Sequence, residues 1–303
     1  MNRYQAFLII GVASVSTSAI LIRFSAEHPL VISFYRMLLT SLILLPFALN
    51  ELNKNRLPRK TILALVGVGA ILALHFGLWI TSLKLTTVAS ATILVCSHPL
   101  FVVPLSQKIL GESLPRLAIA GAVVAFVGIV VMSYGDMSGG SIVGNAIALA
   151  AGVAAGVYIM AGREARKSRE VVGEFGLEKS DSEEVEQEGG GVGIFSYAWI
   201  VYSSCALFTL MVMVPSGNFT ISFPVEDWLL FLSMAIIPTI LGHTMINASL
   251  KEVKAGIAST AILTEPLGAI VLAALAFSEF PPAISLFGGA LVLLGVAMVV
   301  RRE

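Results

Sequence analysis

The sequence predicts an all-α membrane protein with ten transmembrane helices, arranged as an inverted repeat of five helices plus five. Three observations predict this fold class: the composition, a series of long apolar segments, and an internal match between the two halves of the chain. Hydrophobic residues make up 57% of the 303 residues and charged residues only 13%, and the formal net charge is zero. Soluble domains carry about 25% charged residues, so this chain cannot cover a water-facing surface.

The composition also excludes two classes of protein. A nucleic-acid-binding protein is disfavoured because the 19 basic residues are balanced by 19 acidic ones, which leaves no basic excess. A secreted disulfide scaffold is excluded because the two cysteines, Cys96 and Cys205, both lie inside apolar runs.

Ten apolar segments are long enough to cross a hydrocarbon core of roughly 30 Å, which takes about 20 helical residues. Short connections rich in turn-forming residues join most of them, so successive helices are expected to lie side by side and antiparallel. The first segment is interpreted as a spanning helix because no small-residue cleavage site of a signal peptide ends it. The predicted spans are 5–22, 30–49, 61–82, 86–107, 115–134, 141–162, 194–214, 228–249, 255–277 and 283–300.

One connection differs from the others in length and charge. Residues 163–192 begin basic, turn acidic and end near three consecutive glycines. Low hydrophobicity and runs of charge are typical of a solvated linker, with a regulatory segment as the alternative. The predicted organisation is therefore a first five-helix repeat over 1–134, a sixth helix over 135–162 that opens the second repeat, a charged cytoplasmic linker over 163–192, and the remainder of the second repeat over 193–303.

The basic residues predict the orientation in the membrane. All Lys and Arg residues except Arg23, Arg36 and Lys84 fall on the side that holds the N-terminus, the even-numbered loops and the C-terminus. Basic loops remain in the cytoplasm, so both termini are expected there.

An internal repeat appears when the sequence is shifted by about 167 positions. Five helices per copy is an odd number, so the second copy enters the membrane from the opposite side. Inverted repeats supply two near-equal states for alternating access, which favours a carrier. The superposed positions are mainly Pro, Gly and charged residues: Pro99 on Pro266, Glu112 on Glu279, Gly121 on Gly288 and Gly128 on Gly295.

These motifs resemble the drug/metabolite transporter superfamily, and its EamA-like branch above all. The resemblance covers essentially the whole chain except the acidic linker, and it implies a ten-helix exporter of small organic metabolites, often amino acids or drug-like compounds. The residues that carry it are Ser97-His98-Pro99-Leu100 with Gly111-Glu112-Ser113, Thr264-Glu265-Pro266-Leu267 with Ser278-Glu279, and the glycines of the fifth and tenth spans.

Two ionisable residues are expected at equivalent depths near the middle of the bilayer. The repeat relates His98 to Glu265, and each directly precedes a proline that leaves a helix carbonyl without its donor. Charged groups at this depth are costly, so they mark functional sites by default. Glu265 is therefore interpreted as a protonatable or amine-binding group with His98 in the same cavity; the alternative is a structural hydrogen bond.

Other polar residues within the spans are candidates for the same binding site. His75 with Trp79, and His243 with Asn247, are four residues apart and so share one helix face. The alternative for these pairs, and for Tyr158, is hydrogen bonding between packed helices. The sequence leaves three interpretations of Arg36 open. Its side chain could bind a substrate carboxylate, pair with Glu265 or extend to the membrane interface.

The predicted function is a secondary transporter in the plasma membrane that exports amino acids or related metabolites, with proton coupling as one option. No enzyme activity, metal or cofactor is expected, and the partners are a small-molecule substrate and the bilayer. One alternative is a sugar-phosphate or nucleotide-sugar exchanger, which needs basic groups in its cavity. A less favoured one is an intramembrane metal enzyme built on His75, His98, His243 and Glu265.

Overall fold

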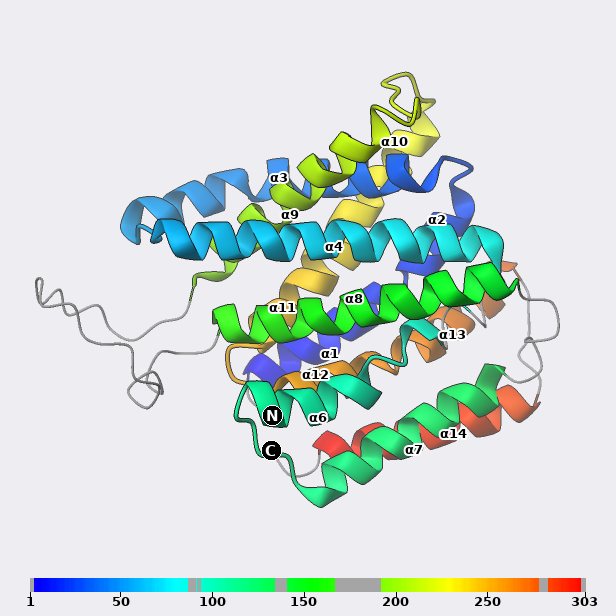
Figure 1. Cartoon of the computed structure of the whole chain (residues 1–303). Helices are drawn as coiled ribbons and strands as arrows, with labels where there is room; N and C mark the ends of the chain where they lie inside the picture. Colours follow the sequence, from blue (N-terminus) through cyan, green and yellow to red (C-terminus); the bar gives the residue numbers. More distant parts are fainter. Residues whose placement is uncertain are drawn as a thin grey trace, which may run out of the picture.

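The computed structural model describes residues 3–86, 91, 94–133, 141–166, 192–277 and 283–300, and this part of the chain is helical and contains no strands. Figure 1 shows the helices as one bundle, with the start of α1 and the end of α14 at the same end. The helices are α1 (Arg3–Val15), α2 (Ser18–Phe24), α3 (Pro29–Lys54), α4 (Arg59–Leu85), α6 (Pro99–Ile109), α7 (Arg116–Ser133), α8 (Ile142–Arg166), α9 (Ile194–Met213), α10 (Val225–Met234), the π-helix η3 (Ala235–Thr244), α11 (Met245–Ser249), α12 (Ala255–Ile262), α13 (Glu265–Phe277) and α14 (Ala283–Val300).

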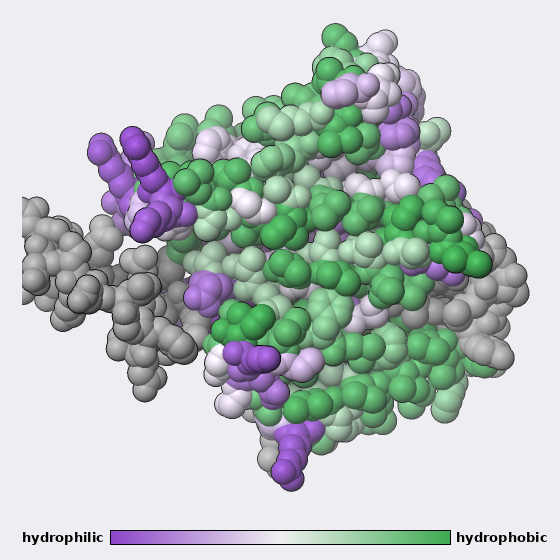
Figure 2. Space-filling model, in the orientation of Figure 1, coloured by the Kyte–Doolittle hydropathy of each residue, from purple (hydrophilic) through white to green (hydrophobic). Residues whose placement is uncertain are grey.

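The helices are long and apolar enough to cross a bilayer several times. Two shorter apolar helices, Arg116–Val131 and Leu286–Val299, accompany six full-length spans. Figure 2 shows apolar residues over the outward surfaces of α4, α7 and α8, where Leu63, Val123 and Val153 are among the exposed side chains. The protein is therefore a multi-pass membrane protein. The six spans in the described residues are Arg3–Phe24, Pro29–Lys54, Arg59–Leu85, Ile142–Arg166, Ile194–Met213 and Val225–Ser249.

Four of the predicted spans are not continuous α-helices. The first, predicted over 5–22, breaks between α1 and α2, where the hydroxyls of Ser16 and Thr17 donate to the carbonyls of Val12 and Ser14. The break lies against α13, because a Cβ added at Gly268 would come within 2.4 Å of the Ser16 hydroxyl oxygen. Side-chain hydroxyls that bond to nearby backbone compete with helical hydrogen bonds, which accounts for the interruption.

The span predicted over 228–249 contains the π-helix η3. Pro238 lies inside η3 and has no N–H to donate, which removes an ordinary helical hydrogen bond. The hydroxyl of Thr239 donates to the carbonyl of Met234, five residues earlier, at 2.7 Å, and Thr244 makes the equivalent bond to Thr239 at 3.1 Å. Wider turns of this kind are often found at functional sites.

The spans predicted over 86–107 and 255–277 are both interrupted just before a proline. Residues 96–98 form a turn before α6 begins at Pro99, and residues 263–264 form a turn before α13 begins at Glu265, followed by Pro266. Proline is tolerated in the first turn of a helix, where its missing N–H has no partner anyway. Both interruptions therefore coincide with the two positions that the repeat relates.

Helices α7 and α14 pack closely and run antiparallel. A Cβ added at Gly121 would lie 2.6 Å from the carbonyl oxygen of Gly295, and one added at Gly128 would lie 2.7 Å from that of Gly288. Only glycine permits this separation of the two backbones. The pair lies side by side along one edge of the bundle (Figure 1).

A buried polar network joins three chain segments at the end of the bundle where α8 finishes. Arg163 Nε donates to Glu112 Oε1 at 2.6 Å, and its Nη1 donates to the carbonyls of Leu250 and Lys251 at 2.7 and 2.8 Å. The second carboxylate oxygen of Glu112 accepts from the N–H of Ala255, the first residue of α12, at 3.0 Å. The network holds the α6–α7 and α11–α12 connections against the end of α8.

Helix α8 extends four residues into the segment predicted as a linker. The helix continues to Arg166, so residues 163–166 are helical. Arg163 and Arg166 are both buried, and each donates to acceptors within the protein; Arg166 donates to the carbonyl of Val192. The remainder of the predicted linker, 167–191, lies outside the described residues.

Candidate functional site

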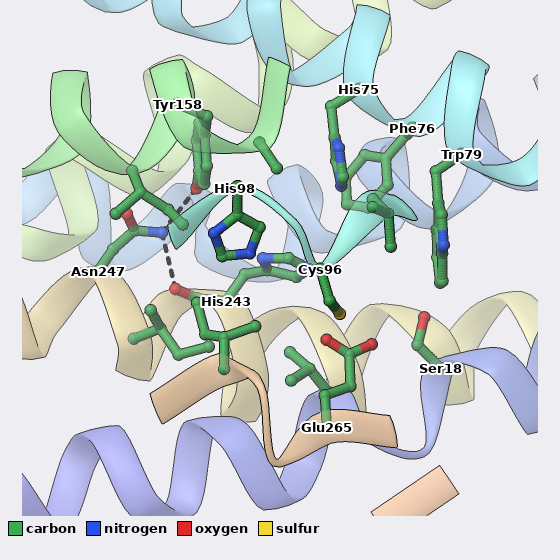
Figure 3. Close-up of a pocket in the computed structure, with 16 residues that line it drawn as sticks. Ser18, His75, Phe76, Trp79, Cys96, His98, Tyr158, His243, Asn247 and Glu265 are labelled. Carbon is green, nitrogen blue, oxygen red and sulfur yellow. Dashed lines mark hydrogen bonds between the residues drawn. The ribbon is translucent and has the colours of Figure 1, made fainter. Parts of the chain in front are cut away.

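A pocket lies where the interrupted helices meet (Figure 3). It is lined from α1 and α2, α4, the turn before α6, α8, η3, α11, α12 and the start of α13. Of the eight site residues predicted from the sequence, all except Arg36 contribute to its wall. The lining residues are Val15, Ser18, His75, Phe76, Trp79, Val95, Cys96, His98, Ala155, Tyr158, Ile159, His243, Ile246, Asn247, Ile262 and Glu265.

The two residues that precede the prolines face this pocket together. Glu265 is the first residue of α13 and is partly exposed to the pocket, and Figure 3 shows its carboxylate directed into it beside Cys96. A helix start is a favourable place for a negative charge, because unpaired backbone N–H groups are concentrated there. His98 is 3% exposed, and its Nδ1 atom has no hydrogen-bond partner in the described structure.

The predicted pair of Asn247 and Tyr158 is joined by a hydrogen bond. The Asn247 side-chain nitrogen donates to the Tyr158 hydroxyl at 2.6 Å and to the carbonyl of His243 at 2.7 Å, as Figure 3 shows. The amide oxygen of Asn247 is buried and unpartnered among the described residues. These contacts fix the side chain of Asn247 with its amide oxygen turned toward Gly162 and the Tyr197 hydroxyl, neither of which lines the pocket.

Three aromatic rings of α4 form the wall of the pocket on the other side. His75 Nδ1 lies 2.9 Å from the carbonyl oxygen of Ala151 on α8, which orients the imidazole ring. The ring of Trp79 is parallel to that of His75, with an interplanar angle of 5° and centroids 6.3 Å apart. Phe76 packs edge-on against His243 across the pocket, at 5.4 Å between centroids. The i, i+4 spacing correctly placed His75 and Trp79 on one face.

Arg36 lies behind the pocket wall. Its exposed fraction is 0%, so the predicted extension to the membrane interface is wrong. Its Nε donates to Thr239 at 2.6 Å, its Nη1 donates to Ser18 at 3.1 Å, and the guanidinium lies 4.6 Å from the ring centroid of Phe76. It forms no ion pair with Glu265 within the described residues. The hydroxyl of Thr239 is a closer partner for Arg36 than any of the predicted ones, because η3 turns it toward α3.

Sequence reasoning missed nine of the sixteen lining residues; six of them are aliphatic, and the other three are Ser18, Phe76 and Cys96. A signal existed for Phe76, since the internal repeat places it on His243. Nothing in the sequence distinguished Ser18 or Cys96 from other small residues within apolar spans. The pocket lining includes no Lys or Arg, and no group of three or more His, Cys, Asp or Glu side chains in the described part of the chain is arranged to hold a metal ion.

Comparison with known proteins identifies the family. A model of the EamA-like transporter family matches residues 3–134 and 190–301, which is most of the chain. The chain belongs to the EamA-like transporter family. This membership agrees with the drug/metabolite transporter superfamily expected from the motifs around His98 and Glu265.

Two relatives of this EamA-like protein are each named an uncharacterized transporter. The one from Archaeoglobus fulgidus is 24% identical over 100% of this chain and 98% of its own length. The one from Clostridium kluyveri is 24% identical over 92% of this chain and 87% of its own length. A crystal structure of another protein, 18% identical, has the same fold with a TM-score of 0.76, and the match covers 98% of this chain and 96% of that one. The EamA-like protein is thus a membrane transporter.

Proposed function

We propose that this transporter is a secondary carrier that exports small organic metabolites, amino acids or related compounds, from the cytoplasm across the plasma membrane. The observation that carries the proposal is the pocket built at two interrupted helices, with one carboxylate, Glu265, at the second interruption. Interrupted helices that meet near mid-membrane are the usual binding sites of secondary transporters. The membrane-spanning ten-helix plan with cytoplasmic termini is part of this proposal.

The contacts between α7 and α14 support an inverted repeat. A shift of about 167 positions carries Gly121 onto Gly288 and Gly128 onto Gly295. The same exchange turns the Gly121–Gly295 contact into the Gly288–Gly128 contact, and both contacts are present. A two-fold axis between the two helices has this property, and such an axis relates the inward-open and outward-open states of an alternating-access carrier.

Contacts elsewhere in the bundle follow the same exchange. Helix α3 packs on α9, and these are the second helices of the two copies. The contact of α4 with α8 corresponds to the contact of α1 with η3 and α11, since the exchange swaps the first with the sixth span and the third with the eighth. The repeat thus supports two similar halves that rock against each other around the pocket.

Proton exchange is the proposed coupling. Glu265 forms no ion pair in the described structure, although the charge of Arg36 behind the pocket wall acts on it, and a carboxylate without a direct partner is costly in a low-dielectric site. A proton or a cationic group on the substrate removes that cost, so binding of one competes with binding of the other. After the substrate has been released outside, inward movement of protons then returns the carrier to its inward-open state.

Counterflow in proteoliposomes tests this proposal. A panel of radiolabelled amino acids and related metabolites is assayed with and without a pH gradient, for the wild type, Glu265→Gln and a control variant, Glu252→Gln. Glu252 is exposed in the α11–α12 connection, away from the pocket. The expected result is flux that a pH gradient accelerates in the wild type and in Glu252→Gln and that loses its pH dependence in Glu265→Gln. Normal flux and normal pH dependence in Glu265→Gln would contradict the assignment.

A further inference from the structure

We infer that the pocket selects amines: substrates with a protonated amino group on an apolar or aromatic body and no carboxylate. This inference rests on the proposed carrier function and, within the small organic metabolites, favours amines over the amino acids. It is carried by the charges, hydrogen-bonding atoms and rings that line the pocket, taken in turn below.

The charges that face the pocket favour a cation. Glu265 is the single carboxylate in the pocket wall, and no Lys or Arg is among the lining residues. The other ionisable lining groups, apart from Tyr158 and Cys96, are the imidazoles of His75, His98 and His243. An ammonium group next to Glu265 therefore gains an opposite charge, whereas a substrate carboxylate there meets a like charge.

The unpartnered polar atoms of the pocket fit a group that donates hydrogen bonds. The carboxylate oxygens of Glu265 are acceptors directed into the pocket, and no donor in the described residues occupies them. The amide oxygen of Asn247 is also unpartnered, but it is turned toward Gly162 and the Tyr197 hydroxyl, outside the pocket lining. An ammonium group has three donors and no acceptor, so it satisfies acceptors that are otherwise left unpaired at a cost of about 1–3 kcal/mol each.

The aromatic side chains offer a matching wall for the apolar part of the substrate. Phe76 and Trp79 on α4 and Tyr158 on α8 enclose the pocket, and Figure 3 shows Phe76 and Trp79 on the α4 side of it, across from Glu265. Aromatic faces bind cations as well as apolar rings. The two features together favour a ligand whose charge and ring are separated by only a few bonds.

The position of Arg36 argues against a substrate carboxylate. It is the only basic side chain among the predicted site residues, but its exposed fraction is 0% and Phe76 and Ser18 stand between it and the pocket. Two of its nitrogens are already bonded to hydroxyls. An amino acid would have to place its carboxylate in this pocket without a cation to receive it.

Three ligands with the same ring separate the alternatives: phenethylamine, phenylalanine and 3-phenylpropanoate. Binding to the full-length protein in detergent is followed by the fluorescence of Trp79, the one of the chain's three tryptophans that lines the pocket, with Trp79→Phe to identify its signal. Phenethylamine is expected to bind about tenfold or more tightly than phenylalanine, and 3-phenylpropanoate to show no saturable binding. Glu265→Gln is expected to weaken phenethylamine about tenfold or more, with Glu252→Gln unchanged.

Each outcome decides between the claims. If phenylalanine or 3-phenylpropanoate binds as tightly as phenethylamine, or if none of the three binds, the amine inference is overturned. This comparison of ligands needs only the wild type, so it remains decisive if Glu265→Gln does not fold. Carrier function fails separately, when proteoliposomes show no counterflow of any amine or amino acid. Flux of amino acids with no preference for amines leaves the carrier in place and removes the inference.

Discussion

Arg36 holds a positive charge about two turns into α3, out of contact with water and with any carboxylate among the described residues. Two hydroxyls, Thr239 and Ser18, and the face of Phe76 are its partners, and its Nη2 atom has none. Burying a charge is expensive, and neutral hydroxyls offset only part of the cost. The hydrogen bonds of Arg36 are therefore largely offset by its desolvation, and the residue adds little to the free energy of unfolding.

Replacing Arg36 with Met is expected to leave the midpoint of thermal unfolding in detergent unchanged or higher. The substitution removes the desolvation cost while an apolar chain of similar length fills the space, and exchanges of this kind are often neutral or stabilising by about 1–4 kcal/mol. Thr239→Val is the matched comparison: it leaves Nε of Arg36 without its acceptor, and we expect a loss of about 1–3 kcal/mol. A large drop for Arg36→Met would show that its hydrogen bonds outweigh its desolvation.

At the scale of helices, the α7–α14 interface depends on the absence of side chains. A Cβ added at Gly128 would lie 2.6 Å from the backbone nitrogen of Val292, and one added at Gly295 would lie 2.4 Å from that of Ala125. Since backbone atoms cannot rotate away, the helices would have to separate.

Gly128→Ala and Gly295→Ala are accordingly expected to destabilise the protein by similar amounts, about 1–3 kcal/mol each. The two positions are related by the repeat, so a common cost tests the two-fold relation as well as the packing. Gly67→Ala in α4 is the control, because its Cβ would meet nothing within 4 Å. There the gain in helix propensity, about 1 kcal/mol, should raise the midpoint of thermal unfolding. Tolerance of both interface substitutions would contradict the contact.

The sequence located the helices better than it located their irregularities. Long apolar runs identify the segments that cross the membrane, and the prolines after His98 and Glu265 marked where two helices are interrupted. The break at Ser16 and the π-helix around Pro238 were not predicted. Both depend on which carbonyl a hydroxyl reaches in three dimensions, and hydropathy averaged over some 20 residues does not contain that information.

At the scale of the whole molecule, the charge distribution leads to a topology prediction. Cys96 and Cys205 are both buried, so a chain with both replaced by Ser gives a background for single-cysteine labelling. Ser222→Cys, in the α9–α10 connection, is expected to react with a membrane-impermeant maleimide in intact cells. Lys54→Cys, at the last residue of α3, should react only after the cells are permeabilised; both positions are exposed in the structure. The reverse pattern would place both termini outside the cytoplasm.

Most of the polar and aromatic residues of the pocket were predictable because such residues stand out within apolar spans. Seven of the eight predicted residues line the pocket, brought together from α4, α8, η3, α11 and the two interruptions. The exception, Arg36, is a long side chain whose direction depends on its neighbours. Position along a helix fixes the depth of its Cα but not which partner the guanidinium reaches.

The hydrogen bonds of Glu112 and Arg163 jointly hold the α11–α12 connection against the end of α8. Arg163 is bonded to Glu112 and to two carbonyls of the α11–α12 connection, and Glu112 caps the start of α12. A movement that draws this connection away from α8 must break both bonds from Arg163 to the carbonyls, together with either the Arg163–Glu112 or the Glu112–Ala255 bond, at about 1.5–3 kcal/mol for each bond to a charged group. Opening at this end is then an all-or-none event, and intermediate widths are rarely populated.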